Sequence, residues 1–285
     1  MHKLPASVLF LALVAWPAVT AAACPPDAVA VGPLCVDAYE ASVWEVLPAN
    51  TTLIEGIKEG RVTATDLSSD GAVQRGTASA DYARGCSASG NGCKDVYAVS
   101  VMGVLPSTYI TWFQAAAACR NAGKRLLTSA EWQAAAFGTP DGAPCNTTGP
   151  GTVGAGSLVG CTSDFGVRDL VGNAWEWVAD WQPQASSCGS TWGGGIDDYG
   201  CVGLNGPPTA VIRGGSWFSG PLAGVFATKN DNTTPFASFY DVGFRCARPI
   251  SSAACTTCTC DRNADRMVTI DELVDGVGKA LTACE

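Results

Sequence analysis

The stretch VRDLVGNAWEWVADW, near the middle of the chain, constrains the fold more than any other feature. Its fifteen residues contain three tryptophans, three acids and the dipeptide Gly172-Asn173. Gly and Asn tolerate positive φ better than other residues, so this dipeptide predicts a sharp turn. If the residues after the turn are extended, Trp175 and Trp177 lie on one face and Glu176 on the other. The stretch therefore predicts a strand that is entered through a tight turn.

Oxygen ligands cluster around this turn. Asp169 and Glu176 flank it, and the carbonyls of Gly172 and Ala174 lie between them. Ca²⁺ prefers a shell of carboxylate and carbonyl oxygens, so the spacing predicts a calcium site. The alternative is that the two carboxylates accept hydrogen bonds from buried backbone N–H groups in a tight corner.

The N-terminal sequence MHKLPASVLFLALVAWPAVTAAAC has a short basic start, an apolar run and an alanine-rich end. This pattern is typical of a secretory signal, and we expect cleavage after Ala23. No later segment offers the roughly 18 uninterrupted apolar residues of a membrane span. The mature chain, 24–285, is therefore predicted to be soluble and secreted, or to lie in a periplasm or at a cell surface.

The charge balance limits the partners. Removing Lys3 from the 17 basic residues leaves 16 against 26 acidic ones, a net charge of −10. Nucleic acids and anionic membranes require clustered Lys and Arg, which argues against both as partners. An acidic chain instead suits bound cations.

All fourteen cysteines lie in the mature chain, and an even number in an exported protein indicates disulfides. A lipid anchor on Cys24 is the minority alternative, since Ala stands where a lipobox usually has Leu and lipidation would leave one cysteine unpaired. The expected local bridges are Cys24–Cys35, Cys86–Cys93, Cys145–Cys161 and Cys188–Cys201. The pairing of the last four is left open: Cys255, Cys258, Cys260 and Cys284.

Local patterns predict a few elements. The first strand is expected at 34–39, and later strands at 210–212 and 242–247. Capping boxes, Thr111 with Gln114 and Thr128 with Glu131, predict one helix to about residue 122 and another ending near 138. Residues 48–106 have no clear periodicity and are interpreted as a long insertion. Lys124 and Arg125, between the helices, either pair with carboxylates or are solvated.

Residues 251–285 are expected to form a separate EF-hand-like module. The run DRNADRMVTIDE matches the loop pattern of a calcium-binding EF-hand, although Arg266 replaces the usual Gly and weakens the expected affinity. The lone half-motif also resembles dockerin repeats, and the alternative is an acidic amphipathic tail held by disulfides. The expected calcium ligands are Asp261, Asn263, Asp265, Met267 through its carbonyl, and Glu272.

Five motifs in order resemble one family. They are DAYEAS at 37–42, AGKRLLTSAEWQAAA at 122–136, GVRDLVGNAWEW at 166–177, RGGSW at 213–217 and GFRCAR at 243–248. Together they resemble the formylglycine-generating enzyme, or sulfatase-modifying-factor, family over residues 33–249. The resemblance implies an α+β fold, a loop-rich, disulfide-stapled variant of the C-type lectin fold.

The resemblance also implies particular sites. In the family, positions that match Asp169, Gly172, Ala174 and Glu176 bind structural Ca²⁺, which adds to the hypothesis drawn from the spacing. A second family calcium site maps weakly near Asn146. Cys246 resembles a family cysteine that is bridged to the one matched by Cys119, so the resemblance implies a Cys119–Cys246 disulfide.

The family's oxidase chemistry uses a copper-binding cysteine pair. The matching positions are Ser219 and Gly224, and neither supplies the thiolate that Cu(I) selects, so copper is not expected. Ser216 matches a serine beside the family's active site. The only histidine is His2, in the signal, which excludes Ser-His-Asp triads and Cys-His pairs from the mature chain. Carboxylate chemistry remains open through Asp231, Asp241 and Glu176.

These observations favour a non-catalytic, calcium-binding module that recognises an exported protein, peptide or glycan. The alternative is a formylglycine-generating-type oxidase, or another enzyme that modifies exported proteins. Aromatic side chains after the RGGSW motif are expected to form the apolar wall of a ligand cleft. These residues are Trp217, Phe218, Phe226, Phe236, Phe239 and Tyr240.

Overall fold

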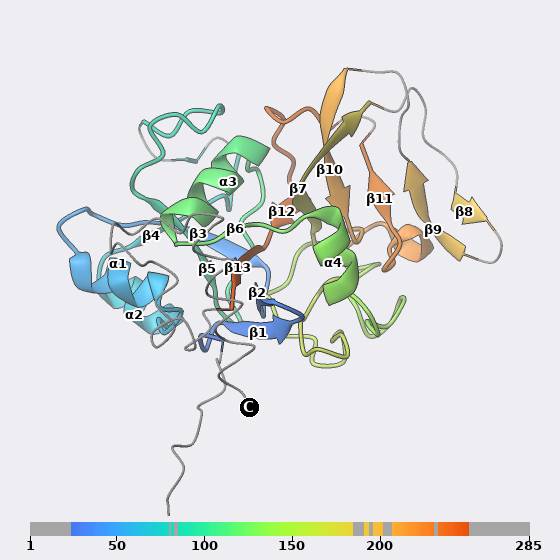
Figure 1. Cartoon of the computed structure of the whole chain (residues 1–285), viewed down its shortest axis with the longest axis horizontal. Helices are drawn as coiled ribbons and strands as arrows, with labels where there is room; N and C mark the ends of the chain where they lie inside the picture. Colours follow the sequence, from blue (N-terminus) through green and yellow to red (C-terminus); the bar gives the residue numbers. More distant parts are fainter. Residues whose placement is uncertain are drawn as a thin grey trace, which may run out of the picture. The chain divides into compact units, whose positions relative to one another are not determined.

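The tryptophan-rich stretch forms an interior strand of the largest sheet. In the computed structural model β7 (Trp175–Pro183) pairs in parallel with β12 (Val242–Phe244) and antiparallel with β10 (Pro208–Arg213). The six-stranded sheet has the order β12-β7-β10-β11-β9-β8 (Figure 1). Its remaining strands are β11 (Thr228–Lys229), β9 (Ile196–Cys201) and β8 (Thr191–Gly193).

The structure describes residues 24–250, except 80, 83, 84, 185–190, 194, 195, 202–206, 231 and 232. They belong to one compact unit, Cys24–Ile250. No helix of this described part is long and apolar enough to span a membrane. The expected signal, the calcium loop at 261–272, Cys188 and Asp231 lie outside the described residues.

Two smaller sheets complete the β structure. One has the order β1-β2-β13-β6 and the other β4-β3-β5. The first strand is not the expected 34–39 segment, because a hairpin strand precedes it. The bounds are β1 Ala28–Val31, β2 Leu34–Asp37, β13 Cys246–Pro249, β6 Arg125–Leu126, β4 Val73–Arg75, β3 Ala41–Glu45 and β5 Val96–Ser100.

Both predicted helices form with their predicted caps. In α3 (Trp112–Asn121) and α4 (Ser129–Ala135) the Thr hydroxyl and the third-position side chain exchange hydrogen bonds with backbone N–H groups. The second helix stops three residues before the expected end at 138. A short 3-10 helix, η1 (Gly220–Leu222), follows the RGGSW motif.

Residues 48–106, interpreted from the sequence as a long insertion, contain regular secondary structure. They contain α1 (Thr51–Lys58), α2 (Ala64–Ser69) and β5, and every residue of β5 is buried. Leu53, Ile57, Leu67 and Val99 belong to one core cluster, which also includes Trp44 of β3. The two helices are short, and β5 is buried along its whole length. The segment therefore shows neither an extended helical period nor the alternation of a half-buried strand, and its elements could not be predicted from the sequence.

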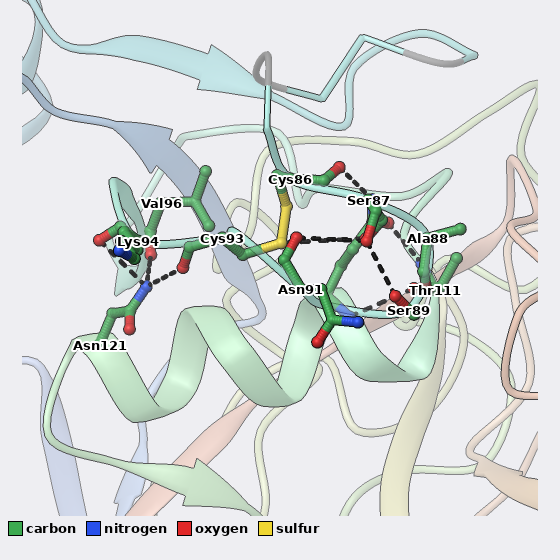
Figure 2. Close-up of a disulfide and its surroundings, with 11 residues drawn as sticks. Cys86, Ser87, Ala88, Ser89, Asn91, Cys93, Lys94, Val96, Thr111 and Asn121 are labelled. Carbon is green, nitrogen blue, oxygen red and sulfur yellow. Dashed lines mark hydrogen bonds between the residues drawn. A yellow bond between two sulfur atoms is a disulfide. The ribbon is translucent and has the colours of Figure 1, made fainter.

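A small disulfide loop holds α3 at both ends (Figure 2). The Cys86–Cys93 bridge closes it. At the helix start, the Thr111 hydroxyl donates to the Ala88 carbonyl at 2.7 Å. At the other end, the amide of Asn121 donates to the Cys93 carbonyl at 2.6 Å. The loop thus positions α3, which packs mainly against β5.

The expected alternation of β7 holds, but both of its faces are buried. Trp175 and Trp177 join one core cluster with Phe244, and Val178 joins another with Trp132. Because α3 packs on one side and α4 on the other, the strand is an interior element.

Four expected disulfides are present: Cys24–Cys35, Cys86–Cys93, Cys119–Cys246 and Cys145–Cys161. The first uses the sulfur on which the lipid-anchor alternative depended. The third joins α3 to β13 across 127 residues of sequence. The predicted Cys188–Cys201 pair lies outside the described side chains.

Candidate functional site

The turn before β7 adopts left-handed backbone angles. Its φ values are 74° at Gly172 and 57° at Asn173, and Asp169 has a φ of 60°. A Cβ on Gly172 would lie 2.3 Å from the carbonyl oxygen of Asn146, so only glycine fits there. The same carbonyl accepts a hydrogen bond from Asn173 N at 2.8 Å. Asn146 therefore braces the turn through its backbone.

Glu176 is paired with a guanidinium. Both carboxylate oxygens accept from Arg245, at 2.6 to 2.9 Å, and one also accepts from the indole N–H of Trp132 at 2.8 Å. Both ionic side chains are 1% exposed. A buried ion pair must be fully hydrogen-bonded to offset its desolvation, and this pair meets that requirement.

Glu40, in the short connection between β2 and β3, is a second buried carboxylate at the turn. It accepts from the Asn173 amide at 2.5 Å and from Ala174 N at 3.1 Å. Burial raises the pKa of Glu40 well above its usual value, and the charges of Asp169 and Glu176 raise it further. The sequence analysis predicted the turn but did not identify Glu40 as its hydrogen-bond partner.

Asp169 is the third buried carboxylate at the turn. Its Oδ2 accepts from Gly156 N at 2.5 Å. Burial raises the pKa of Asp169 to about 6, in spite of that hydrogen bond. Three buried carboxylates, Glu40, Asp169 and Glu176, thus interact with one guanidinium, that of Arg245. The interior around the turn has an excess of negative charge.

The donor set at the turn fits a hard cation. Outside the strand ladders, no backbone hydrogen bond among the described residues ends on the carbonyl of Gly172 or Ala174. With the Asp169 carboxylate, they offer the oxygen ligands that Ca²⁺ prefers. Glu176, the fourth expected ligand, differs from the others because both of its carboxylate oxygens already accept from Arg245. A divalent ion here would offset the excess negative charge.

The positions matched to the family's reactive centre form a hydrogen-bonded corner. Ser219 Oγ accepts from Ser216 N at 2.9 Å, and the two hydroxyls are 3.3 Å apart. Ser216 Oγ also donates to Asp241 Oδ2 at 3.3 Å. Burial raises the pKa of Asp241. None of the described residues is a histidine, so within this part of the chain neither hydroxyl has an imidazole to take its proton.

The second matched position, Gly224, has no room for a side chain. A Cβ built on it would lie 1.8 Å from Oδ1 and 2.3 Å from Oδ2 of Asp198. Asp198, on β9, is 2% exposed, and its Oδ2 accepts from Phe226 N at 2.7 Å. A buried aspartate therefore occupies the space that a cysteine at this position would need.

The six aromatic residues expected in one cleft are divided. Trp217, Phe218 and Tyr240 form a cluster with centroid separations of 4.8 to 6.1 Å, and Phe218 stacks on Tyr240. Phe218 and Tyr240 are each 49% exposed. We call these three residues the aromatic cluster.

The other three aromatic residues lie elsewhere. Phe236 contacts Phe113, which also meets Trp181. Phe239 packs against the core, and Phe226 lines a pocket beside α4. The cleft expected from the sequence is therefore smaller than predicted.

Sequence reasoning missed Glu40, Arg245 and Asp198. The hydrogen bond from Asn173 to Glu40 spans 133 residues, and that from Arg245 to Glu176 spans 69. No local spacing can join such positions. Glu40 lies in the motif DAYEAS and Arg245 in GFRCAR, so the two motifs that carry the family resemblance were the signal that could have pointed to them.

The fold and site define a disulfide-bridged α+β domain built around an acidic turn. Residues 29–152 and 143–250 match the model of the sulfatase-modifying factor enzyme 1-like domain, so the chain belongs to that family. The expected fold class is thereby confirmed.

Curated relatives match over half of the chain. The formylglycine-generating enzyme of Bos taurus is 30% identical over 175 residues, covering 50% of this chain and 43% of the relative. That of Streptomyces coelicolor is 28% identical over 172 residues, covering 50% and 52%. The inactive C-alpha-formylglycine-generating enzyme 2 of Bos taurus is 29% identical over 171 residues, covering 50% of each. The chain spans about half the length of these relatives.

Solved structures are similar only in part. The Major Tropism Determinant M1 variant has a TM-score of 0.46 at 20% identity, covering 80% of this chain and 54% of that one. The P3c variant has a TM-score of 0.36 at 27% identity, covering 49% and 38%.

Proposed function

We propose that this protein is a secreted, calcium-stabilised recognition module of the sulfatase-modifying-factor family that does not carry out the copper-dependent oxidation. The observation that carries the proposal is the contact at Gly224, where Asp198 fills the space of the second thiolate. The first thiolate position is Ser219, whose hydroxyl is engaged by Ser216 N.

Two soft sulfur ligands are needed to hold Cu(I), and a hydroxyl and a hydrogen atom do not replace them. The eight cysteines whose side chains are described are all paired in disulfides. No thiolate from this described part of the chain is therefore free to take over. The domain keeps the family scaffold around a reactive centre whose residues have changed.

Calcium binding at the turn is the second part of the proposal. Asp169, with the carbonyls of Gly172 and Ala174, would hold the ion, and Glu176 would complete the set. The excess of buried negative charge supports it, since such charge is costly without a cation. A separate ion is proposed for the loop with Asp261, Asn263, Asp265, Met267 and Glu272.

The aromatic cluster is the proposed ligand surface. Trp217, Phe218 and Tyr240 offer ring faces, and Asp241 beside them offers a hydrogen-bond acceptor. Stacked rings with a polar neighbour suit a sugar ring or an apolar peptide side chain. The proposed ligand is therefore an exported peptide or a glycan.

The test is turnover. The full chain is incubated with a sulfatase-type cysteine peptide, copper and a reductant, and the peptide is analysed by mass spectrometry. We expect no loss of sulfur above the metal-only control, because the copper ligands are missing. Formylglycine above that control would establish the alternative, an oxidase, and overturn the proposal. Copper uptake alone is not the readout, since other side chains bind copper weakly.

A further inference from the structure

A pocket beside α4 is separate from the aromatic cluster. It has a volume of about 700 Å³, and its lining is mainly apolar. Three phenylalanines at it are unusually exposed, Phe137 at 67%, Phe165 at 42% and Phe226 at 44%. Neighbouring apolar side chains left in water often mark an interaction surface.

The contacts of Arg213 fix the positions of the segments that line the pocket. Arg213 stacks over the ring of Trp132 at 4.8 Å and donates to Gln133, a lining residue on α4. It also donates to the carbonyls of Val225 and Phe226, at 3.3 and 3.4 Å. One buried guanidinium thus joins both walls, so the pocket is pre-formed and needs little ordering when a ligand binds.

Acidic side chains gather at the Phe226 end. Asp141, Asp197 and Asp198 have carboxylate oxygens within 4.8 Å of one another. Asp198 accepts from the backbone of Phe226, which lines the pocket, and Asp141 follows the lining residue Thr139 by two positions. Among the described residues, none of the three acids has a salt bridge. Arg213 interacts electrostatically with the buried Asp198, whereas Asp141 and Asp197 are exposed, so the apolar pocket has an acidic rim with more carboxylates than nearby cations.

The charge of this rim selects the occupant. The segment 251–285 carries six acidic residues against three basic ones, so it does not complement the rim. A second copy of this chain, whose mature form has a net charge of −10, is also a poor match. An occupant must bring an apolar group for the phenylalanines and positive charge for the carboxylates.

We propose that this pocket docks a basic segment of a partner protein, in which an aromatic or aliphatic side chain enters among Phe137, Phe165 and Phe226 and a neighbouring Lys or Arg binds the carboxylates of Asp141 and Asp197. Rim charges of this kind act mainly on the association rate and on specificity, and their effect weakens with salt. The phenylalanines supply the buried apolar contact.

The probe is an array of ten-residue peptides that place one Trp or Leu at every spacing from one to five residues from a Lys-Arg pair. Each peptide has a charge-inverted copy with Glu-Glu. Binding of the full chain is measured by fluorescence anisotropy at low and high salt. We expect basic peptides to bind at least tenfold more tightly than their inverted copies, with the preference reduced by salt. An array without this preference overturns the proposal.

Matched variants locate the binding. Asp141→Asn with Asp197→Asn, and separately Phe137→Ser, are expected to weaken the best peptide at least tenfold. Glu55→Gln and Leu47→Ser, an exposed acid and an exposed apolar residue elsewhere, should leave it unchanged. Tyr240→Ala should also leave it unchanged, which separates this surface from the aromatic cluster. Loss of binding in Tyr240→Ala but not in the pocket variants would overturn the assignment, as would occupation of the acids by Ca²⁺ alone with no peptide bound.

Discussion

Several charged side chains of this protein are buried with partners. Lys124, which the sequence left open between pairing and solvation, has a side chain that is 1% exposed and pairs with Asp27 at 2.5 Å and Asp37 at 2.6 Å. Arg125, its neighbour, pairs with Glu131 at 2.7 Å but is partly exposed. The exposed pair contributes little to stability, whereas breaking the buried one would leave an uncompensated charge.

Asp37 gives a pH dependence whose sign follows from its surroundings. Burial raises its pKa from 3.8 to about 6, more than the Lys124 ammonium lowers it. The folded state therefore binds more protons than the unfolded state between pH 4 and 6, and the free energy of unfolding falls as pH rises through this window. We expect Asp37→Asn to reduce this fall in the free energy of unfolding by about 3 kcal/mol, at 1.36 kcal/mol per pKa unit, whereas the part that comes from Asp169, whose pKa is also raised, should remain.

The measurement is urea denaturation of wild type and variant from about pH 4 to about pH 7. The slope with pH is the readout, because the variant also loses hydrogen bonds and its absolute stability changes. Asp70→Asn, at an exposed aspartate, should keep the slope of the wild type. If Asp37→Asn keeps it too, Asp37 is not its source.

Gly224 and Asp198 should be coupled. Gly224→Ala places a methyl group within 2.3 Å of the Asp198 carboxylate, and overpacking of this kind costs about 1–3 kcal/mol. When Asp198 is also replaced by Ala, the methyl group that Gly224→Ala adds no longer meets a carboxylate. A double-mutant cycle by denaturation should therefore give a stabilising interaction energy between the two changes, above about 0.5 kcal/mol. Additive effects would show that the aspartate moves aside freely, and would weaken the steric argument against a cysteine at 224.

At the scale of elements, the helices begin where their capping boxes predict, but their positions depend on distant segments. The 86–93 loop holds α3 at both ends, as Figure 2 shows. Gly90 lies so close to the helix that a Cβ would be 2.7 Å from the Phe113 carbonyl. A part of the chain without a recognisable pattern thus fixes a helix that the sequence located well.

Asn121 tests this role of the loop. Its amide donates to the carbonyls of Cys93 at 2.6 Å and Val96 at 2.8 Å. Asn121→Ala should lower the free energy of unfolding by about 1–3 kcal/mol, because partly buried carbonyls lose their donors. Asn91→Ala, in the same loop but exposed, is the matched control and should change it by less than about 0.5 kcal/mol. Equal losses in the two variants would contradict the role given to Asn121.

At the scale of the whole molecule, one long-range bridge and one acidic turn tie distant parts together. In the chain-entropy model, closing the loop between Cys119 and Cys246 contributes about 5 kcal/mol, against about 2.5 for the short Cys86–Cys93 loop. Glu40 and Arg245 reach the turn before β7 from opposite ends of the domain. A ligand bound at this turn would therefore act on the stability of the entire unit.

Calcium at the turn should raise the main unfolding temperature, because the ion binds only the folded state. At a concentration 100 times its Kd, the gain is about 2.7 kcal/mol. Asp169→Asn should abolish the shift, while Asp164→Asn, five residues away and exposed, should retain it. Glu176→Gln also breaks the pair with Arg245, so it should lower the unfolding temperature even in chelator.

Scanning calorimetry with calcium or with chelator measures these shifts. Glu272→Gln is expected to affect only a transition of the 251–285 segment. A wild-type curve that is the same in calcium and in chelator would remove both proposed sites.

The sequence by itself determined the features that depend on neighbouring residues. The turn at Gly172-Asn173, the alternation of Trp175 and Trp177, and the two capping boxes follow from backbone preferences within a few positions. The family motifs, several residues each, identified the fold and one long bridge. These signals lie within a few neighbouring residues, so they can be recognised without knowing which parts of the chain pack against them.

Only the tertiary structure decided which charges meet and where space remains. Glu40 reaches Asn173, Arg245 reaches Glu176 and Asp198 fills the space beside Gly224, and each contact joins segments at least 26 residues apart in the chain. Burial then raises the pKa of Glu40 and of Asp198, because desolvation depends on every element that covers them. Pairing, burial and steric space are properties of the packed chain, and for that reason the acidic turn, the blocked cysteine position and the pocket beside α4 became visible only in the fold.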